Sequence, residues 1–142
     1  MSTYQKKEIL IVDDCEPFLS QLVDGIEKFD WNSYSCKVDA VSNVDSALEM
    51  SQNHDYNLII TDMQMPEKSG SCFIKNLRKI NKYCKTPVIV MSGFFRMPPS
   101  SEYGIYAENL IFIDKPFTLS NLRKVVNSAL STLPNQTKGK SS

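Results

Sequence analysis

Four short apolar runs recur along the chain, and each of them stops at a charged or hydroxyl residue. The runs cover residues 9–12, 58–61, 88–91 and 110–113, and Ile and Val are frequent in them. Continuous apolar runs of about four or five residues are typical of parallel strands that are buried on both faces. We therefore expect four such strands, whose ends are marked by Asp13-Asp14, Asp62, Ser92 and Asp114-Lys115-Pro116.

The first run is followed by apolar residues at helical spacing. Pro17 falls in the first turn of this expected helix, where proline is tolerated because its missing N–H would have no partner there. The apolar stripe consists of Phe18, Leu19, Leu22, Val23, Ile26 and Phe29. Residues 36–41 then alternate only partly between apolar and polar, which indicates a strand near an edge of the sheet.

Three more helical stripes are present further along the chain. Ser42 or Asn43 can cap the first of these, and residues 53–55 end it. The second lies in residues 73–80 and the third in residues 119–133. Their apolar positions are Val44, Ala47, Leu48 and Met50, then Phe73, Ile74, Leu77 and Ile80, and finally Leu119, Leu122, Val126, Ala129, Leu130 and Leu133.

Between residues 93 and 109 the apolar pattern weakens. Pro98-Pro99 removes backbone donors, so we expect any helix in this region to be short or irregular. The alternation of strands and helices elsewhere predicts a parallel sheet with right-handed crossovers and helices on both faces. We assign residues 8–133 to this one domain, with an N-terminal extension at 1–7 and a polar tail at 134–142.

Composition narrows the class of protein. Hydrophobic residues make up 42% of the 142 positions and charged residues 23%, as in ordinary globular domains. The 16 Lys and Arg residues balance the 16 Asp and Glu residues, so the broad positive field that nucleic-acid binding requires is missing. The cysteines are widely spaced without a C-x-x-C pair, no apolar run approaches 18 residues, and residues 1–7 lack the hydrophobic stretch of a signal peptide. We expect an intracellular, cytoplasmic protein with reduced thiols.

The residues that end the strands predict one reaction centre. Because the carboxyl ends of parallel strands form the ligand-binding edge of an open sheet, Asp13, Asp14, Asp62, Ser92 and Lys115 should meet there. Three neighbouring carboxylates repel one another unless a cation compensates their charge. Hard carboxylate oxygens favour Mg²⁺, which also binds phosphate oxygens. The pattern therefore indicates a magnesium-dependent site for a phosphoryl group and a switch that phosphorylation controls.

These motifs resemble the receiver domains of two-component response regulators, including the chemotaxis regulators, over approximately residues 8 to 132. The matching features, in the order of the family, are Asp13-Asp14, Asp62 followed by Met63-Gln64-Met65-Pro66 and Gly70, then Ser92, and then Lys115-Pro116-Phe117. The resemblance implies a flavodoxin-like, doubly wound sheet of five parallel strands in the order 2-1-3-4-5.

By the same resemblance, Asp62 is the phosphoacceptor. Mg²⁺ is expected to bind Asp14, Asp62 and the main-chain carbonyl of Gln64, while Asp13 acts largely through water. Lys115 offsets the remaining negative charge during in-line attack by Asp62 on the phosphoryl group. The chain would thus catalyse only its own phosphorylation and dephosphorylation and would not be an enzyme in the ordinary sense.

Ser92 and Phe112 are the expected switch. The hydroxyl of Ser92 can bind a phosphoryl oxygen only when one is present, and Phe112 occupies the position of the ring that swings inward in receivers. Plain packing in a buried strand is the alternative for Phe112. The output face would consist of the region 93–109, the strand 110–113 and the last helix.

The expected partners follow from the resemblance. The phosphodonor would be a phosphohistidine on a sensor histidine kinase or a histidine phosphotransfer protein, as part of a phosphorelay. An unidentified downstream protein would bind the output face, and formation of a homodimer stays open. We expect no direct contact with nucleic acid or a membrane.

Other functions remain as alternatives. A pseudo-receiver would act as a binding scaffold without phosphorylation, although the complete acidic set argues against it. An aspartyl phosphohydrolase usually has an acid two residues after its nucleophile, where Gln64 stands. A flavin-binding protein would need a loop rich in Ser, Thr or Gly after the first strand, where Asp13-Asp14-Cys15-Glu16 would repel phosphate. Within the receiver interpretation, a bulky Phe94 could shield the acyl phosphate from water.

Overall fold

The computed structural model describes residues 5–93 and 109–131. In these residues five parallel strands form one sheet in the order β2-β1-β3-β4-β5, which confirms the predicted topology. The elements are β1 (Gln5–Val12), α1 (Glu16–Glu27), β2 (Tyr34–Val41), α2 (Val44–Asn53), β3 (Leu58–Asp62), α3 (Gly70–Leu77), the 3₁₀ turn η1 (Asn81–Tyr83), β4 (Val88–Ser92), β5 (Leu110–Asp114) and α4 (Leu119–Ser131).

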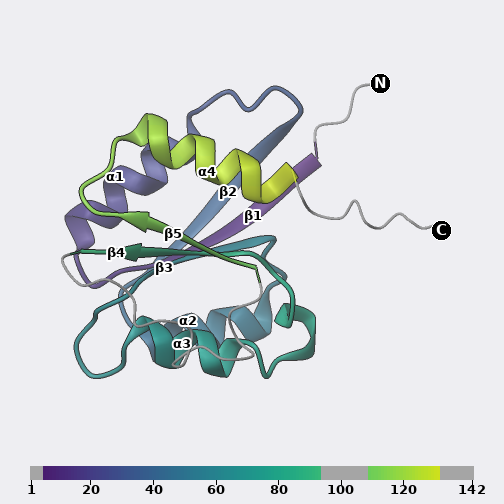
Figure 1. Ribbon diagram of the computed structural model, residues 1–142. Helices are drawn as coiled ribbons and strands as arrows, with labels where there is room; N and C mark the ends of the chain where they lie inside the picture. Colours follow the sequence, from purple (N-terminus) through teal and green to yellow (C-terminus); the bar gives the residue numbers. More distant parts are fainter. Residues whose placement is uncertain (1–4, 94–108, 132–142) are drawn as a thin grey trace.

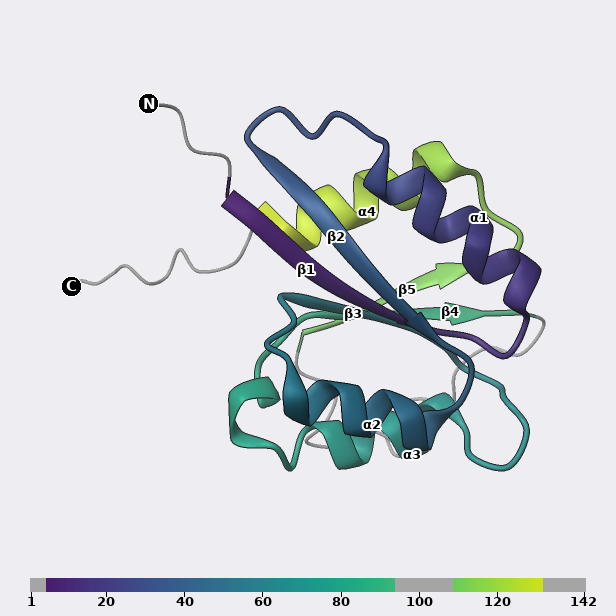
Figure 2. The ribbon, with the colours of Figure 1, turned by 180° about the vertical axis from the view of Figure 1, so that it is seen from behind.

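Helices cover both faces of the sheet, as the apolar pattern predicted. Figures 1 and 2 show α1 and α4 on one face and α2 and α3 on the other. Because successive strand residues point to opposite faces, Ile9 and Ile11 of β1 join the core under α1 and α4, while Leu10 and Val12 join the core under α2 and α3. Burial on both faces explains why the central strands are continuously apolar.

Side-chain caps begin three of the described helices, α2, α3 and α4, the last through Thr118, whose Oγ1 accepts from the N–H of Asn121 at 3.0 Å. The Oδ1 of Asn43 accepts a hydrogen bond of 2.8 Å from the backbone N–H of Ser46, so Asn43 caps α2 and Ser42 does not. The Oγ of Ser69 accepts from the N–H of Cys72 at 3.2 Å and caps α3. Each of these oxygens satisfies a backbone donor that the first helical turn leaves without a partner.

Several boundaries differ from the prediction, among them the starts of β2 at Tyr34 and of α3 at Gly70. β1 begins at Gln5, so residues 5–7 are strand residues although they were assigned to an extension. Their backbone pairs with β2 from Tyr34 onward, and this pairing does not require apolar side chains. α1 ends at Glu27 and α3 at Leu77, so Phe29 and Ile80 lie beyond the helices whose stripes they were expected to continue.

The prediction that β5 is buried on both faces was wrong. No strand in the described part of the chain pairs with its outer side, Leu110 and Ile111 are only partly buried, and Phe112 is 46% exposed. β2 forms the other edge, as expected. The irregular segment predicted between residues 93 and 109 lies outside the described residues except for its two ends, as do Leu133 and the tail at 134–142.

The remaining expectations concern membrane spans and thiols. Among the described helices, none combines the length and the apolar composition that crossing a bilayer requires. The cysteines are free thiols, of which only Cys36 is buried. His54 is exposed and directly follows α2 as its C-cap residue.

Candidate functional site

The register of the sheet brings the ends of four strands together. Val12 of β1 pairs with Thr61 of β3, and Ser92 of β4 pairs with Asp114 of β5. Pairing continues past the strands, because the N–H of Lys115 donates to the carbonyl of Ser92 at 2.6 Å. The residues that follow the apolar runs therefore meet at one edge of the sheet.

Three carboxylates form a cluster at this edge. One oxygen from each of Asp13, Asp14 and Asp62 lies within 4.8 Å of the others. Asp13 is 1% exposed and Asp62 8% exposed, whereas Asp14 is at the surface. The Oδ1 of Asp13 also accepts from the backbone N–H of Cys15 at 2.9 Å, which orients this carboxylate in the loop after β1. The predicted acidic cluster is therefore present.

Lys115 bridges the two buried carboxylates of the cluster. Its Nζ lies 3.1 Å from Oδ2 of Asp13 and 3.3 Å from Oδ1 of Asp62. The lysine side chain is 28% exposed, so water screens these ion pairs less than pairs on the open surface. The structure thus joins Asp13, Asp62 and Lys115, as the sequence predicted.

Burial and the neighbouring charges together set the pKa values of Asp62 and Lys115. Burial raises the pKa of Asp62, and the neighbouring Asp13 raises it further, while Lys115 counteracts both effects. Burial disfavours the charged ammonium of Lys115, but Asp62 and Asp13 outweigh burial and raise its pKa. Three carboxylates against one ammonium leave the cluster with an excess of negative charge, which a cation would stabilise.

The donor atoms of the cluster fit a hard divalent cation. All three carboxylates offer oxygen, and the exposed Asp14 leaves one side of the cluster open to water. Mg²⁺ prefers a few carboxylate oxygens together with several waters or phosphate oxygens. Gln64 lies at the surface two residues beyond Asp62, and the role of its carbonyl as a metal ligand stays a prediction.

The two predicted switch residues have different surroundings. Ser92 is 3% exposed, and its Oγ lies 3.4 Å from Oδ1 of Asp114 at the end of β5. Phe112 is 46% exposed on the edge strand β5, so it is less buried than the apolar run predicted. Movement of Phe112 during switching stays a prediction, and Phe94 lies outside the described residues.

Gly70 allows the start of α3 to approach the backbone of Asp62 closely, because glycine has no Cβ. A Cβ at this position would clash with the carbonyl oxygen of Asp62 and would lie 3.0 Å from the Cα of Met63. The N–H of Gly70 donates to the carbonyl of Met63 at 2.9 Å. Gly70 therefore fits the family motif for a steric reason, since the start of α3 packs directly on the chain that carries Asp62.

Sequence reasoning assigned Phe18 only to the apolar stripe of the first helix. In the structure the Nζ of Lys115 lies over the Phe18 ring, 4.8 Å from its centroid. The ring of Phe117, which closely follows Lys115 in the chain, lies 5.9 Å from the Phe18 ring. The signal available in the sequence was an aromatic residue in the first turn after Asp14 together with another just beyond Lys115.

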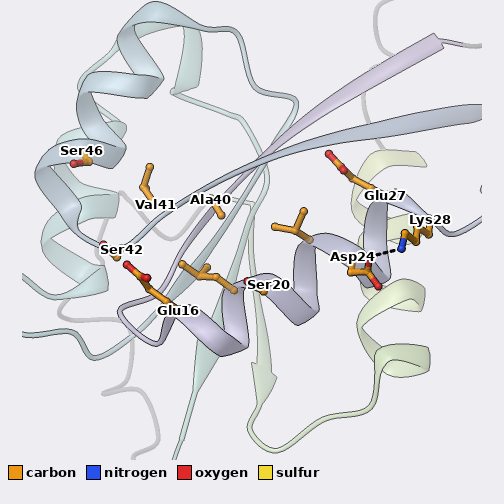
Figure 3. A pocket seen from close by; sticks show the side chains of 11 residues that line it. Glu16, Ser20, Asp24, Glu27, Lys28, Ala40, Val41, Ser42 and Ser46 are labelled. Atoms are coloured by element: carbon orange, nitrogen blue, oxygen red, sulfur yellow. Dashed lines mark ion pairs between the residues drawn. The ribbon is translucent and has the colours of Figure 1, made fainter.

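A separate groove of about 590 Å³ lies between α1, the end of β2 and the start of α2 (Figure 3). Its wall from α1 includes Glu16, Asp24 and Glu27, and Asp24 pairs with Lys28 at 2.8 Å. Glu27 accepts a hydrogen bond of 2.7 Å from the N–H of Val38, a backbone donor of the edge strand β2. The groove contains none of the clustered aspartates, so it is distinct from the acidic site.

Comparison with known proteins shows the family of the chain. Residues 9–127 match the response regulator receiver domain, and the chain belongs to this family. Receiver domains are signalling domains. The response regulator Rre1 of Synechocystis sp. is 28% identical over 123 residues, which are 87% of this chain and 51% of Rre1. The chemotaxis protein CheY1 of Helicobacter pylori is 24% identical over 128 residues, which are 88% of this chain and 98% of CheY1.

Solved structures have the same fold. The chemotaxis protein CheY4 of Vibrio cholerae superposes with a TM-score of 0.76 at 23% identity, over 88% of this chain and 99% of that one. The signal receiver domain of a histidine kinase from Syntrophus aciditrophicus gives a TM-score of 0.76 at 24% identity, over 96% and 97% of the two chains. The chain spans about half the length of Rre1 and nearly all of CheY1.

Proposed function

We propose that this receiver domain is a phosphoacceptor switch in which Asp62 carries the phosphoryl group. The observation that supports this most directly is the setting of the Asp62 carboxylate. It is nearly buried, belongs to a cluster of three acids and lies 3.3 Å from the ammonium of Lys115. This setting supports Asp62 as the nucleophile, because a group of acids that could hold a cation and a positive side chain lie beside it.

The reaction begins with a carboxylate oxygen of Asp62 as the nucleophile. This oxygen attacks phosphorus in line, the bond from phosphorus to the donor nitrogen breaks, and the electron pair leaves with the imidazole nitrogen. The product is an acyl phosphate on Asp62. Lys115 supplies positive charge beside the attacking oxygen, and its contact with Asp13 keeps the ammonium in the site.

Asp14 and Asp62, with Asp13 acting largely through water and the carbonyl of Gln64 as a further ligand, would hold Mg²⁺. When bound, this ion neutralises charge on the carboxylates and on the phosphoryl oxygens. The oxygen donors of the cluster and its excess of negative charge support the choice of a hard divalent ion. Phosphorylation should therefore depend on magnesium.

The switch would act through Ser92 and Phe112. The Ser92 hydroxyl, now beside Asp114, would turn to a phosphoryl oxygen on Asp62 and draw its loop inward. Phe112 would then leave its exposed position on β5 and move inward. This change would alter the face formed by β5 and α4, where a downstream protein would bind; residues 94–108, which the sequence also assigned to this face, lie outside the described residues.

The phosphodonor would be a sensor histidine kinase or a histidine phosphotransfer protein. Membership of the receiver family supports this partner class. We also propose that an unidentified downstream protein binds this domain, and formation of a homodimer stays open. Because the donor would be a phosphohistidine protein, we also propose that the domain belongs to a phosphorelay.

Phosphorylation by a small donor tests the proposal. The protein, the Asp62→Asn variant and the Asp24→Asn variant are incubated with acetyl phosphate in the presence of magnesium or EDTA, and intact masses are measured. Asp24 is an exposed aspartate on α1 and serves as the control. We expect a phosphoryl adduct on the unmodified protein and on Asp24→Asn with magnesium only, and none on Asp62→Asn. Absence of the adduct from all samples would favour the binding scaffold.

A further inference from the structure

We propose that Phe18 is a positioning residue that holds the Lys115 ammonium beside Asp62 during phosphoryl transfer. This inference rests on the proposed function, because it concerns the same reaction. In the described contacts the Phe18 ring meets Lys115 and Phe117 but not the reacting carboxylate of Asp62, so Phe18 would act through Lys115.

The geometry places three groups around one ammonium. Asp13 and Asp62 approach the Nζ of Lys115 at 3.1 and 3.3 Å, and the Phe18 ring centroid lies 4.8 Å away. A cation within about 6 Å of an aromatic centroid is attracted by the negative face of the ring, more strongly where water is partly excluded. Lys115 is 28% exposed, which meets this condition.

A ring has an advantage over a third carboxylate at this position. The lysine stem is flexible, and its ammonium must leave part of its contact with Asp62 when that oxygen bonds to phosphorus. The face of Phe18 attracts the charge without using a particular N–H group, so these donors stay available for phosphoryl oxygens. Asp13 and the ring then retain the ammonium at the site before and after transfer.

Phe18 is itself held in place. Its ring packs against that of Phe117 at a centroid distance of 5.9 Å and an interplanar angle of 56°, and both rings border the core under α1 and α4. Phe18 belongs to the first turn of α1, whereas Phe117 follows the lysine. The contact therefore ties the helix that follows Asp14 to the segment that carries Lys115.

Substitutions that change the charge distribution of the ring separately from its volume test this role. Phe18→Leu keeps an apolar side chain, Phe18→Tyr keeps the aromatic face, and pentafluorophenylalanine at position 18 keeps the shape but reverses the charge distribution of the ring. Phe29→Leu is the matched control, because the Phe29 ring makes a cation–π contact of 4.3 Å with Arg123 instead. Phosphorylation by acetyl phosphate with magnesium is followed against time, with melting temperatures measured alongside.

We expect the Leu and pentafluoro variants to phosphorylate about threefold to tenfold more slowly at saturating magnesium, while Phe18→Tyr and Phe29→Leu keep the original rate. A normal rate in a folded pentafluoro variant would overturn the inference, and so would an equally slow, folded Phe18→Tyr variant. Should Phe18→Leu fail to fold, the pentafluoro variant decides.

Nuclear magnetic resonance of the metal-free protein separates this inference from the proposed function. The aromatic ring should shift the resonance of the protons next to the Lys115 ammonium, and Phe18→Leu should remove this shift. An unmodified protein that accepts no phosphoryl group would contradict the proposed function, while the resonance comparison would still test the contact. Identical lysine resonances in the two proteins would overturn the positioning role.

Discussion

The ammonium of Lys115 lies 3.1 Å from the Oδ2 of Asp13, although 102 positions separate the two residues in the chain. The parallel register from β1 to β5 produces this ion pair, because it aligns the ends of strands that are remote in sequence. Asp13 is almost fully buried, so removal of its partner would leave a charge in a poorly solvated place. The same carboxylate belongs to the cluster that we expect to bind magnesium.

Lys115→Met should tighten magnesium binding while it slows phosphorylation. The lysine charge lies within 3.3 Å of two carboxylates and opposes a second cation there. Its removal should raise the magnesium affinity about fivefold or more, given the size of charge interactions at this separation. Isothermal titration calorimetry measures the affinity. Lys68→Met is the control, because Lys68, in the loop after β3, forms an exposed ion pair with Asp45 of α2. Weaker magnesium binding by Lys115→Met would contradict the prediction.

Asp62→Asn should stabilise the metal-free protein at neutral pH. Burial and Asp13 raise the pKa of Asp62, so the folded state holds this proton more tightly than the unfolded state does. The contribution of this carboxyl group to the free energy of unfolding is fully present below its unfolded pKa of 3.8. It is lost as the pH rises through the pKa of the folded state. The amide avoids this loss, and the expected gain is about 1 kcal/mol in the free energy of unfolding at pH 7.

Urea unfolding in EDTA measures this difference across the pH range. The advantage of Asp62→Asn should shrink as the pH falls toward the ordinary carboxyl pKa, where the unmodified protein becomes protonated. Asp24→Asn, an exposed substitution, provides the comparison. An Asp62→Asn protein that is less stable than the original at neutral pH would show that the ion pair with Lys115 outweighs burial and repulsion.

Gly70→Ala should destabilise the fold and slow phosphorylation. The added Cβ clashes with the carbonyl of Asp62, so the backbone that carries the phosphoacceptor must move. We expect a loss of about 2 kcal/mol, as for other overpacked positions. Gly93→Ala is the control for stability, since no described atom lies within 4 Å of a Cβ built there. Equal unfolding free energies for the two variants would refute the steric argument.

Tyr83→Phe should lower stability by about 1 to 2 kcal/mol. The buried Tyr83 hydroxyl lies 2.7 Å from the carbonyls of Ser51 and His54 and 3.3 Å from the backbone nitrogen of Tyr56. It thereby connects η1 to the end of α2. Tyr34→Phe should cost less, because the Tyr34 hydroxyl makes a single partly buried bond to Asn127. Thermal or urea unfolding measures both variants, and a larger loss in Tyr34→Phe would contradict this ranking.

Much of the candidate site was predictable from local sequence. Continuous apolar runs mark strands buried on both faces, and parallel strands of such a fold present their carboxyl ends at one edge. The residues directly after the runs, Asp13, Asp62 and Lys115, therefore had to lie near one another. The family motifs identified the chain as a receiver domain for the same reason, since they consist of these strand ends in a fixed order.

Other features depended on how the elements pack. Apolar spacing placed Phe18 on the inner side of a helix but did not reveal which charged group its ring would meet. An apolar run also does not tell a central strand from an edge strand, which is why the exposure of Phe112 was missed. The polar residues at the start of β1 have no alternating or apolar pattern that predicts a strand. They form one because their backbone pairs with β2.

The pattern of residues along the chain was sufficient to predict the alternating strands and helices, the acidic edge of the sheet and the family. Each of these depends on residue type and order along the backbone. The contacts among Lys115, Asp13 and Phe18, the packing of Gly70 on Asp62 and the exposure of β5 were decided by the folded structure. They depend on the register between strands and on how closely helices approach the sheet. Both are results of packing over the whole domain, and local sequence carries no direct signal for them.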